Sequence, residues 1–119
     1  TVAAFITGWV REFGKSALEE GLMTLARCAS VNVANFFGYP QKSGIQKGND
    51  ADLVIFDTDK KWKVKKEDLF TKLQWSTYEG IELIGRPVAT FLRGALVYEH
   101  GDIVGSRQGQ WLRKGMTHE

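Results

Sequence analysis

The fold of this chain is decided at one stretch, Gly44-Ile45-Gln46-Lys47-Gly48-Asn49-Asp50-Ala51-Asp52-Leu53-Val54-Ile55-Phe56-Asp57. Its two glycines can adopt backbone conformations that residues with a side chain rarely adopt. Asn49-Asp50 favours a tight turn through hydrogen bonds between side chain and backbone. The apolar run 53–56 consists of β-favouring residues and predicts a strand that is buried on both faces. A turn and strand of this kind also occur in unrelated α/β domains, so the rest of the chain has to identify the family.

Length and composition indicate an ordinary folded protein. A chain of 119 residues suffices for one domain with a core but is small for a catalyst that carries its own scaffold. Hydrophobic residues make up 43% and charged residues 25%, and the net charge of +2 does not indicate an acidic partner. The first residue is Thr1, so we expect a fragment or a processed piece. Without a secretion signal or a membrane-spanning apolar run, the expected location is cytoplasmic, with no membrane partner.

Residues 1–43 have helical periodicity. A first helix, ended by Gly14, is predicted by an apolar stripe of Val2, Phe5, Ile6, Trp9, Val10 and Phe13. Ser16 and Glu19 match a capping box at the start of a second helix. The buried stripe expected for that helix is Leu18, Leu22, Leu25, Ala26 and Ala29.

A third, short helix is predicted to start at a cap formed by Asn32 and to stop at Gly38. Its expected packing residues are Val33, Phe36 and Phe37. The single cysteine, Cys28, lies in the helical apolar pattern, and we expect it to be a buried small hydrophobe rather than a reactive thiol.

After Gly48 the periodicity becomes extended. Trp62 and Val64 alternate with lysines, which predicts a strand with one buried and one solvated face. A short helical turn is expected at 66–70 and a loop at 74–85. The predicted hairpin has strands at 88–92 and 95–99 joined by Arg93-Gly94, and a second turn at 100–102 precedes Ile103-Val104.

The order of these segments carries a family resemblance. The positions concerned are Ser30, Asn32, Ala34, Phe37-Gly38, Lys42, Gly44, Gly48 to Leu53, Arg93-Gly94 and Val97-Tyr98-Glu99. They resemble the segment by which amidohydrolases pass from their catalytic barrel into a small β-domain. The run 76–80, Ser-Thr-Tyr-Glu-Gly, is most similar to the cyclic amidohydrolase branch that contains allantoinase, dihydroorotase and hydantoinase or dihydropyrimidinase. Val33, Ser43 and Thr77 depart from the family pattern and weaken the assignment to this branch.

The resemblance implies an α+β fragment. Residues 1–43 would be the C-terminal helices of a (β/α)8 barrel, and residues 44–119 part of the small β-sandwich with a C-terminal tail. The implied activity of the parent enzyme is hydrolysis of a cyclic amide C–N bond. The family performs it with a binuclear divalent metal site, commonly zinc, built from histidines, an aspartate and often a carboxylated lysine, which activates a water molecule.

No residue of this chain is predicted to be catalytic, cofactor-binding or metal-binding. His100 and His118 lack the spacing of metal ligands, and the resemblance implies that the family's ligands lie upstream of Thr1. Asp50 and Asp52 could bind a cation, but two carboxylates are few for calcium, so a role in the turn is preferred. A nucleic-acid strip is disfavoured, because acidic residues flank the lysines around Trp62, which are Lys60, Lys61, Lys63, Lys65 and Lys66.

Two other interpretations stay open. The run 9–14, Trp-Val-Arg-Glu-Phe-Gly, favours an aminoacylase-type amidohydrolase, although the long hairpin tail disfavours it. The chain could also be a stand-alone, non-enzymatic domain that self-associates through the apolar stripe of its first helix. The expected partners are the rest of the parent barrel, a further copy of the chain in a homo-oligomer, and a small cyclic amide as substrate of the parent. No nucleic acid is expected.

Overall fold

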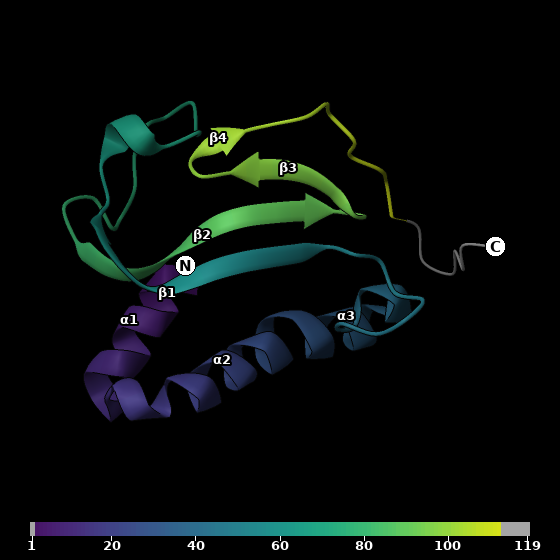
Figure 1. The fold of residues 1–119 in the computed structure, drawn as a ribbon, viewed down its shortest axis with the longest axis horizontal. Coiled ribbons are helices and arrows are strands. Elements are labelled where there is room, and N and C mark those ends of the chain that lie inside the picture. Colours follow the sequence, from purple (N-terminus) through teal and green to yellow (C-terminus); the bar gives the residue numbers. More distant parts are fainter. Residues whose placement is uncertain (1, 113–119) are drawn as a thin grey trace.

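The computed structural model describes residues 2–112, in which a helical part precedes a sheet. The helical elements are α1 (Val2–Phe13), η1 (Lys15–Ala17), α2 (Leu18–Ala26), η2 (Arg27–Val31), α3 (Asn32–Phe37) and η3 (Pro40–Lys42). The remaining elements are β1 (Leu53–Lys63), η4 (Lys66–Asp68), β2 (Glu82–Leu92), β3 (Ala95–Glu99) and β4 (Asp102–Ile103). The strands form one antiparallel sheet in the order β1-β2-β3-β4, and the long helical rod from α2 to α3 runs beside it (Figure 1).

The first predicted helix is confirmed as α1, which ends before Gly14 at a positive φ of 82°. Trp9 anchors α1 to α2. Its indole Nε1 donates a hydrogen bond of 2.8 Å to the carbonyl oxygen of Ala17, and its ring lies against Gly21. Because Gly21 has no side chain, the two helices approach closely at this point.

The capping residues predicted for the second and third helices are wrong. Ser16 lies inside the 3-10 turn η1, and the cap position of α2 is Ala17, without a side-chain hydrogen bond. Asn32 has helical dihedral angles, because the π-helical turn η2 joins α2 to α3 and leaves no helix start for it to cap. The predicted stop is confirmed, since Gly38 ends α3 in the left-handed conformation.

Much of the predicted burial along the rod is also wrong. Cys28 is exposed, as are Ala26 and Ala29 of the second predicted stripe. The expected packing residues of α3 are exposed as well, with Phe36 at 83% of its full accessibility. The physical reason is that this face of the rod is not covered by any part of residues 2–112.

The strand predicted at 53–56 is present, but its burial on both faces is not. Val54 and Ile55, whose side chains point to opposite faces of the sheet, are 59% and 54% exposed, because no part of residues 2–112 covers either face there. The predicted alternation is confirmed farther along, where Trp62 is partly buried and Val64 is 4% exposed beside solvated lysines.

The loop predicted at 74–85 ends earlier, since β2 already begins at Glu82 and pairs Leu83 with Trp62. The pairing with β1 has register shifts, and near one of them Gly85, at a φ of 92°, makes room for the Phe56 ring. The hairpin is confirmed, with Arg93 and Gly94 both at positive φ, and the turn at His100-Gly101 precedes β4.

The core lies where α1 crosses the sheet. Ala3, Val64 and Leu83 are its buried residues, and the partly buried residues around them are Ala4, Phe56, Trp62, Leu69 and Tyr78. One polar side chain is buried beside them. The Thr7 hydroxyl donates to the carbonyl oxygen of Ala3 at 2.6 Å and accepts the N–H of Ile84 at 2.8 Å, so it joins α1 directly to β2.

This core is small for the length of the chain. The accessible surface is 9128 Å², compared with about 6,500 Å² for a typical folded monomer of this mass. The radius of gyration is 15.9 Å, where about 13.5 Å is usual. The N-terminal stripe is partly covered by the chain itself, since Ile6 is only 1% exposed whereas Val2 and Phe13 are 43% and 58% exposed. Further open apolar surface lies on α3, β1 and the segment 70–81.

Gly21→Ala should destabilise the protein, because its Cβ would lie 2.7 Å from Cδ1 of Trp9. We expect the free energy of unfolding to fall by about 1–3 kcal/mol in urea titrations. Gly8→Ala is the matched control, since no atom lies within 4 Å of that Cβ, and it should raise stability by about 0.5–1 kcal/mol. Equal effects of the two substitutions would contradict the contact between Trp9 and Gly21.

Thr7→Val should cost about 1–3 kcal/mol of unfolding free energy, because it leaves the N–H of Ile84 without its acceptor at similar side-chain volume. Thr7→Ser keeps the hydroxyl and should cost no more than about 1 kcal/mol. Chemical denaturation of both variants separates the hydroxyl from the methyl group. A larger loss for Thr7→Ser would show that packing of the methyl matters more than the hydrogen bonds.

Candidate functional site

The most strongly bonded polar cluster lies where the helical part passes into the sheet. Lys42, at the end of η3, places its ammonium 2.8 Å from Oδ2 of Asp50 and also pairs with Oδ2 of Asp52. Oδ1 of Asp52 accepts the N–H of Arg93 at 2.7 Å, so this carboxylate reaches the β2–β3 turn. The cluster therefore ties the end of the helices to the start of β1 and to the hairpin.

Its charges are mutually compensating. Burial lowers the pKa of Lys42, but the hydrogen bonds and charges of Asp50 and Asp52 outweigh this, so its pKa is raised. Burial raises the pKa of Asp52, but the Lys42 ammonium and the Arg93 N–H outweigh it, so its pKa is lowered. The buried Oδ2 of Asp50 has no hydrogen bond of good geometry, which leaves the ion pair with Lys42 as its compensation.

This geometry supports the structural interpretation of the paired aspartates. A lysine of the chain itself occupies the position between the carboxylates, where a metal cation would have to lie. We name these residues, Lys42, Asp50, Asp52 and Arg93, the junction cluster. It stabilises a turn and has no group placed to act on a substrate.

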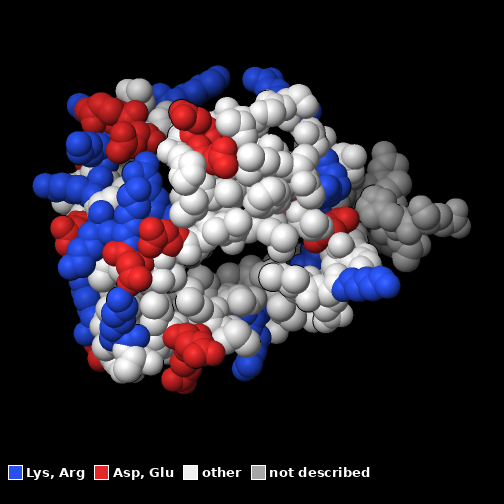
Figure 2. All heavy atoms as spheres, viewed as in Figure 1, with Lys and Arg blue, Asp and Glu red and all other residues white. Residues whose placement is uncertain are grey.

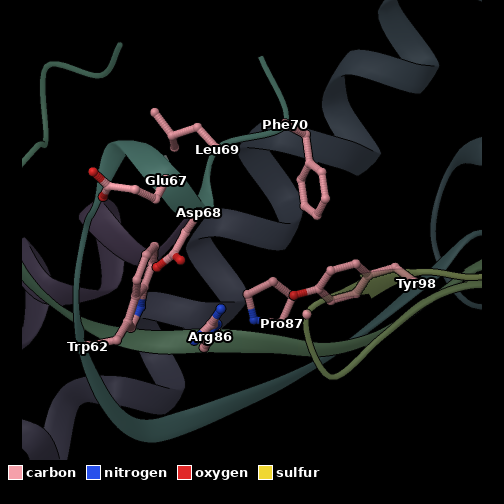
Figure 3. A pocket seen from close by; sticks show the side chains of 9 residues that line it. Trp62, Glu67, Asp68, Leu69, Phe70, Arg86, Pro87 and Tyr98 are labelled. Carbon is pink, nitrogen blue, oxygen red and sulfur yellow. The ribbon is translucent and has the colours of Figure 1, made fainter. Parts of the chain in front are cut away.

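A shallow cavity of about 340 Å³ lies over β2, beneath the segment that follows β1 (Figure 3). The Arg86 guanidinium carbon lies 5.3 Å from the centre of the Trp62 ring in a cation–π contact. Glu67 and Asp68 come from η4, and Phe70 and Tyr98 face the cavity from the other side (Figure 3). The lining contains no Ser, Cys or His, so this cavity can bind a molecule but has no nucleophile activated by a base.

The predicted lysine cluster does not form a uniform basic strip. Figure 2 shows Lys and Arg gathered at one end of the molecule with Asp and Glu among them, while the middle of this face is largely uncharged. Lys15 of η1, for example, pairs with Asp59 of β1. The mixture of signs is typical of a solvated strand face and not of a phosphate-backbone groove.

The residues do not fit the metal site that the resemblance implies. Within residues 2–112, no group of three or more His, Cys, Asp or Glu side chains could hold a metal ion. His100 is exposed in a turn and Cys28 is exposed on η2, far along the chain from one another. His118 lies outside the described residues. A binuclear metal would need ligands from elsewhere.

Sequence reasoning missed the two contacts that organise these sites. Lys42 lies ten residues before Asp52, and the two belong to no recognisable motif. Their ion pair forms only because the turn between them brings the two side chains together. Arg86 and Trp62 come from neighbouring strands, and only the register of β1 with β2 brings them together. The available signal was the positive charge of Arg86, which lies in β2 among mainly apolar residues.

Comparison with known proteins identifies relatives for most of the chain. It is 36% identical over 101 residues to dihydroorotase of Pyrococcus horikoshii, a match covering 82% of this chain and 24% of that protein. It is 42% identical over 89 residues to allantoinase of Rubrobacter xylanophilus, covering 75% of this chain and 20% of that protein. No family profile matches the chain.

Solved structures agree with these relatives. The fold matches L-hydantoinase (dihydropyrimidinase) from Arthrobacter aurescens with a TM-score of 0.75 and 31% sequence identity, over 88% of this chain and 22% of that one. The chain is a segment related to the cyclic amidohydrolases. It spans about a quarter or less of the length of these cyclic amidohydrolases. Among residues 2–112, no helix has the length and apolar character needed to cross a bilayer.

Stability should depend on pH through the junction cluster. Because the pKa of folded Asp52 is lowered, its stabilisation is present above its ordinary value of 3.8 and is lost as pH falls through the folded pKa. Because the pKa of folded Lys42 is raised, its stabilisation is present below 10.5 and is lost as pH rises through the folded pKa.

Asp52→Asn provides the test at the acid end. Near neutral pH it should lower the unfolding free energy by about 1–3 kcal/mol. The difference from the wild type should shrink below about pH 4, where the wild-type carboxylate also becomes neutral. Lys42→Gln should behave likewise above about pH 10.5. A difference that stays constant across the acid range would contradict the ion pair.

Proposed function

We propose that this chain is the C-terminal portion of a metal-dependent cyclic amidohydrolase whose complete form hydrolyses a cyclic amide. In that reaction water adds across the ring amide, so the C–N bond breaks, the carbonyl carbon gains the oxygen, and the nitrogen leaves as an amine or amide N–H. The observation that carries the proposal is similarity over most of this chain to proteins named dihydroorotase, allantoinase and L-hydantoinase. Those names support a cyclic amide as the substrate class.

The part assigned to this chain is structural. We propose that residues 1–43 belong to the edge of a catalytic barrel and residues 44–119 to a small β-sandwich, as the helical and extended halves suggest. Two contacts support a joint role for the halves: the Thr7 hydroxyl bonds β2, and the junction cluster fixes the passage from η3 to β1. These contacts would hold the sheet in one orientation against the barrel.

The metal, expected to be zinc, would be held by residues outside this chain. Support comes from the absence of any suitable ligand group within residues 2–112 and from the small share of each relative that the chain spans. The open apolar surface on α3 and β1 supports the rest of the enzyme, or a further copy of it, as the partner. A cytoplasmic location stays a prediction.

The isolated chain should show no hydrolysis of dihydroorotate, allantoin, hydantoin or dihydrouracil, and no tightly held metal after purification. The physical reason is that residues 2–112 provide no ligand set for the metal. Metal analysis after dialysis, combined with assays of each compound, tests this. A stoichiometric ion that resists chelators, or turnover by the chain alone, would contradict the proposal.

The complementary experiment reads the gene upstream of the Thr1 codon and expresses the complete reading frame. A His-x-His motif after a predicted strand, together with hydrolysis of one of these cyclic amides that chelators abolish, is the expected result. A start codon directly before Thr1 would favour the stand-alone domain instead. Asp52→Asn in the complete enzyme is a useful control, since it should reduce stability more than turnover per folded molecule.

A further inference from the structure

A second cavity, of about 260 Å³, lies where the irregular part of β1 meets β2 and the turn that follows β3. Its lining residues are Asp57, Lys60, Arg86, Pro87, Val88 and His100. Lys60, Arg86 and His100 can all donate hydrogen bonds to an anion, whereas Asp57 supplies the only carboxylate of the lining. The cavity shares Arg86 and Pro87 with the first cavity, contains no residue of the junction cluster, and does not rest on the proposed hydrolase activity.

Arg86 is held in place before any ligand binds. Its guanidinium lies over the Trp62 ring, and the Trp62 indole is itself fixed, because Nε1 donates to the carbonyl oxygen of Gly85 at 2.8 Å. A contact with the face of a ring leaves the N–H groups at the edge of the guanidinium free to form hydrogen bonds. Arg86 also lines the first cavity with Glu67 and Asp68, but it forms no ion pair within 4.0 Å among residues 2–112, so these donors are available to a ligand.

Asp57 is engaged in shaping the backbone. Its Oδ1 accepts the N–H of Asp59 at 2.9 Å and the N–H of Lys60 at 3.1 Å, and this turn carries β1 through the break in register between Asp57 and Lys61. Although Asp57 is paired with Arg86 in the strand register, the two side chains form no ion pair within 4.0 Å. The turn therefore brings Lys60 to the cavity while occupying one oxygen of the carboxylate.

His100 is fixed by the opposite wall. Its backbone has a φ of 49°, in the left-handed region, and its N–H donates to the carbonyl oxygen of Val88 at 2.8 Å. That bond holds the turn after β3 against β2 and keeps the imidazole at the cavity. Three separate elements thus place cationic or N–H-bearing side chains around one space.

We propose that this cavity binds a small oxyanion, such as the phosphate or carboxylate group of a metabolite. Arg86 is the principal ligand, because a guanidinium binds such groups through two parallel hydrogen bonds. Lys60 adds charge and His100 adds an N–H donor from the far wall. Asp57 opposes the anion and limits its affinity.

The test is a calorimetric titration of the 119-residue chain with sodium phosphate, and separately with sodium acetate, at constant ionic strength set by sodium chloride. Saturable binding of one of the two at one site per chain is expected, and the tighter anion identifies the phosphate or carboxylate class. The imidazole resonances of His100, followed by NMR, should shift with the same dissociation constant. The absence of saturable binding of both anions would overturn the proposal.

Variants separate a built site from general attraction to a basic surface. Arg86→Gln should weaken binding by about tenfold, and Lys60→Gln, at an exposed position that the fold does not need, by about threefold. Lys65→Gln is the matched control. It removes the same charge from a residue just after β1 that does not line the cavity, and it should leave binding unchanged. An equal loss for Lys60→Gln and Lys65→Gln would overturn the proposal.

Asp57→Asn gives a change in the opposite direction. The amide oxygen can still accept the N–H groups of Asp59 and Lys60, so the turn is kept while the negative charge is removed. Binding of the anion should tighten by about threefold. If Asp57→Asn left the affinity unchanged or weakened it, the anion would not lie beside this carboxylate and the assigned site would be wrong.

Discussion

The contact between α1 and β2 is the constraint on which the rest of the structure depends. The small core lies at this crossing, and the Thr7 hydroxyl connects the two elements by bonding one atom of each backbone. A buried hydroxyl is stable in an apolar environment only when its donor and acceptor capacities are used, so this contact fixes both the depth and the direction of the helix. From α1, the turn η1 leads the chain into the helical rod from α2 to α3. The junction cluster then fixes the passage from the end of the rod into β1.

The thin core and the large accessible surface have a common explanation in this arrangement. Helix α1 packs against one part of the sheet, but much of the helical rod and of the sheet is left without cover from residues 2–112. The relatives are about four times longer or more, which provides ample chain to cover those faces in the complete proteins. Within this segment, the arrangement of the elements therefore depends more on polar contacts between them than on burial of apolar side chains.

Local patterns predicted the elements well and the contacts between them poorly. The end of α1 at Gly14, the alternation around Trp62 and the hairpin at Arg93-Gly94 each depend on neighbouring residues and were predicted correctly. Ser16 and Asn32 were assigned as caps because their spacing is right, but a 3-10 turn and a π-helical turn removed the helix starts they would have served. Three contacts could be found only in the structure, because their partners are far apart in sequence and no helical or strand periodicity relates them. They are made by Lys42, Arg86 and Thr7.

The position of β1 at the edge of the sheet has a consequence for how this segment behaves in solution. An edge strand presents unpaired backbone N–H and C=O groups to which a strand of another molecule can add. In β1 the irregular stretch after Asp57 and the lysines beyond it interrupt such addition, because a bend and like charges both oppose a regular ladder. The apolar stretch 53–56 carries no charge, and its pairing with β2 shifts register once, between Ile55 and Phe56, so growth into ordered aggregates would start from this half of the strand.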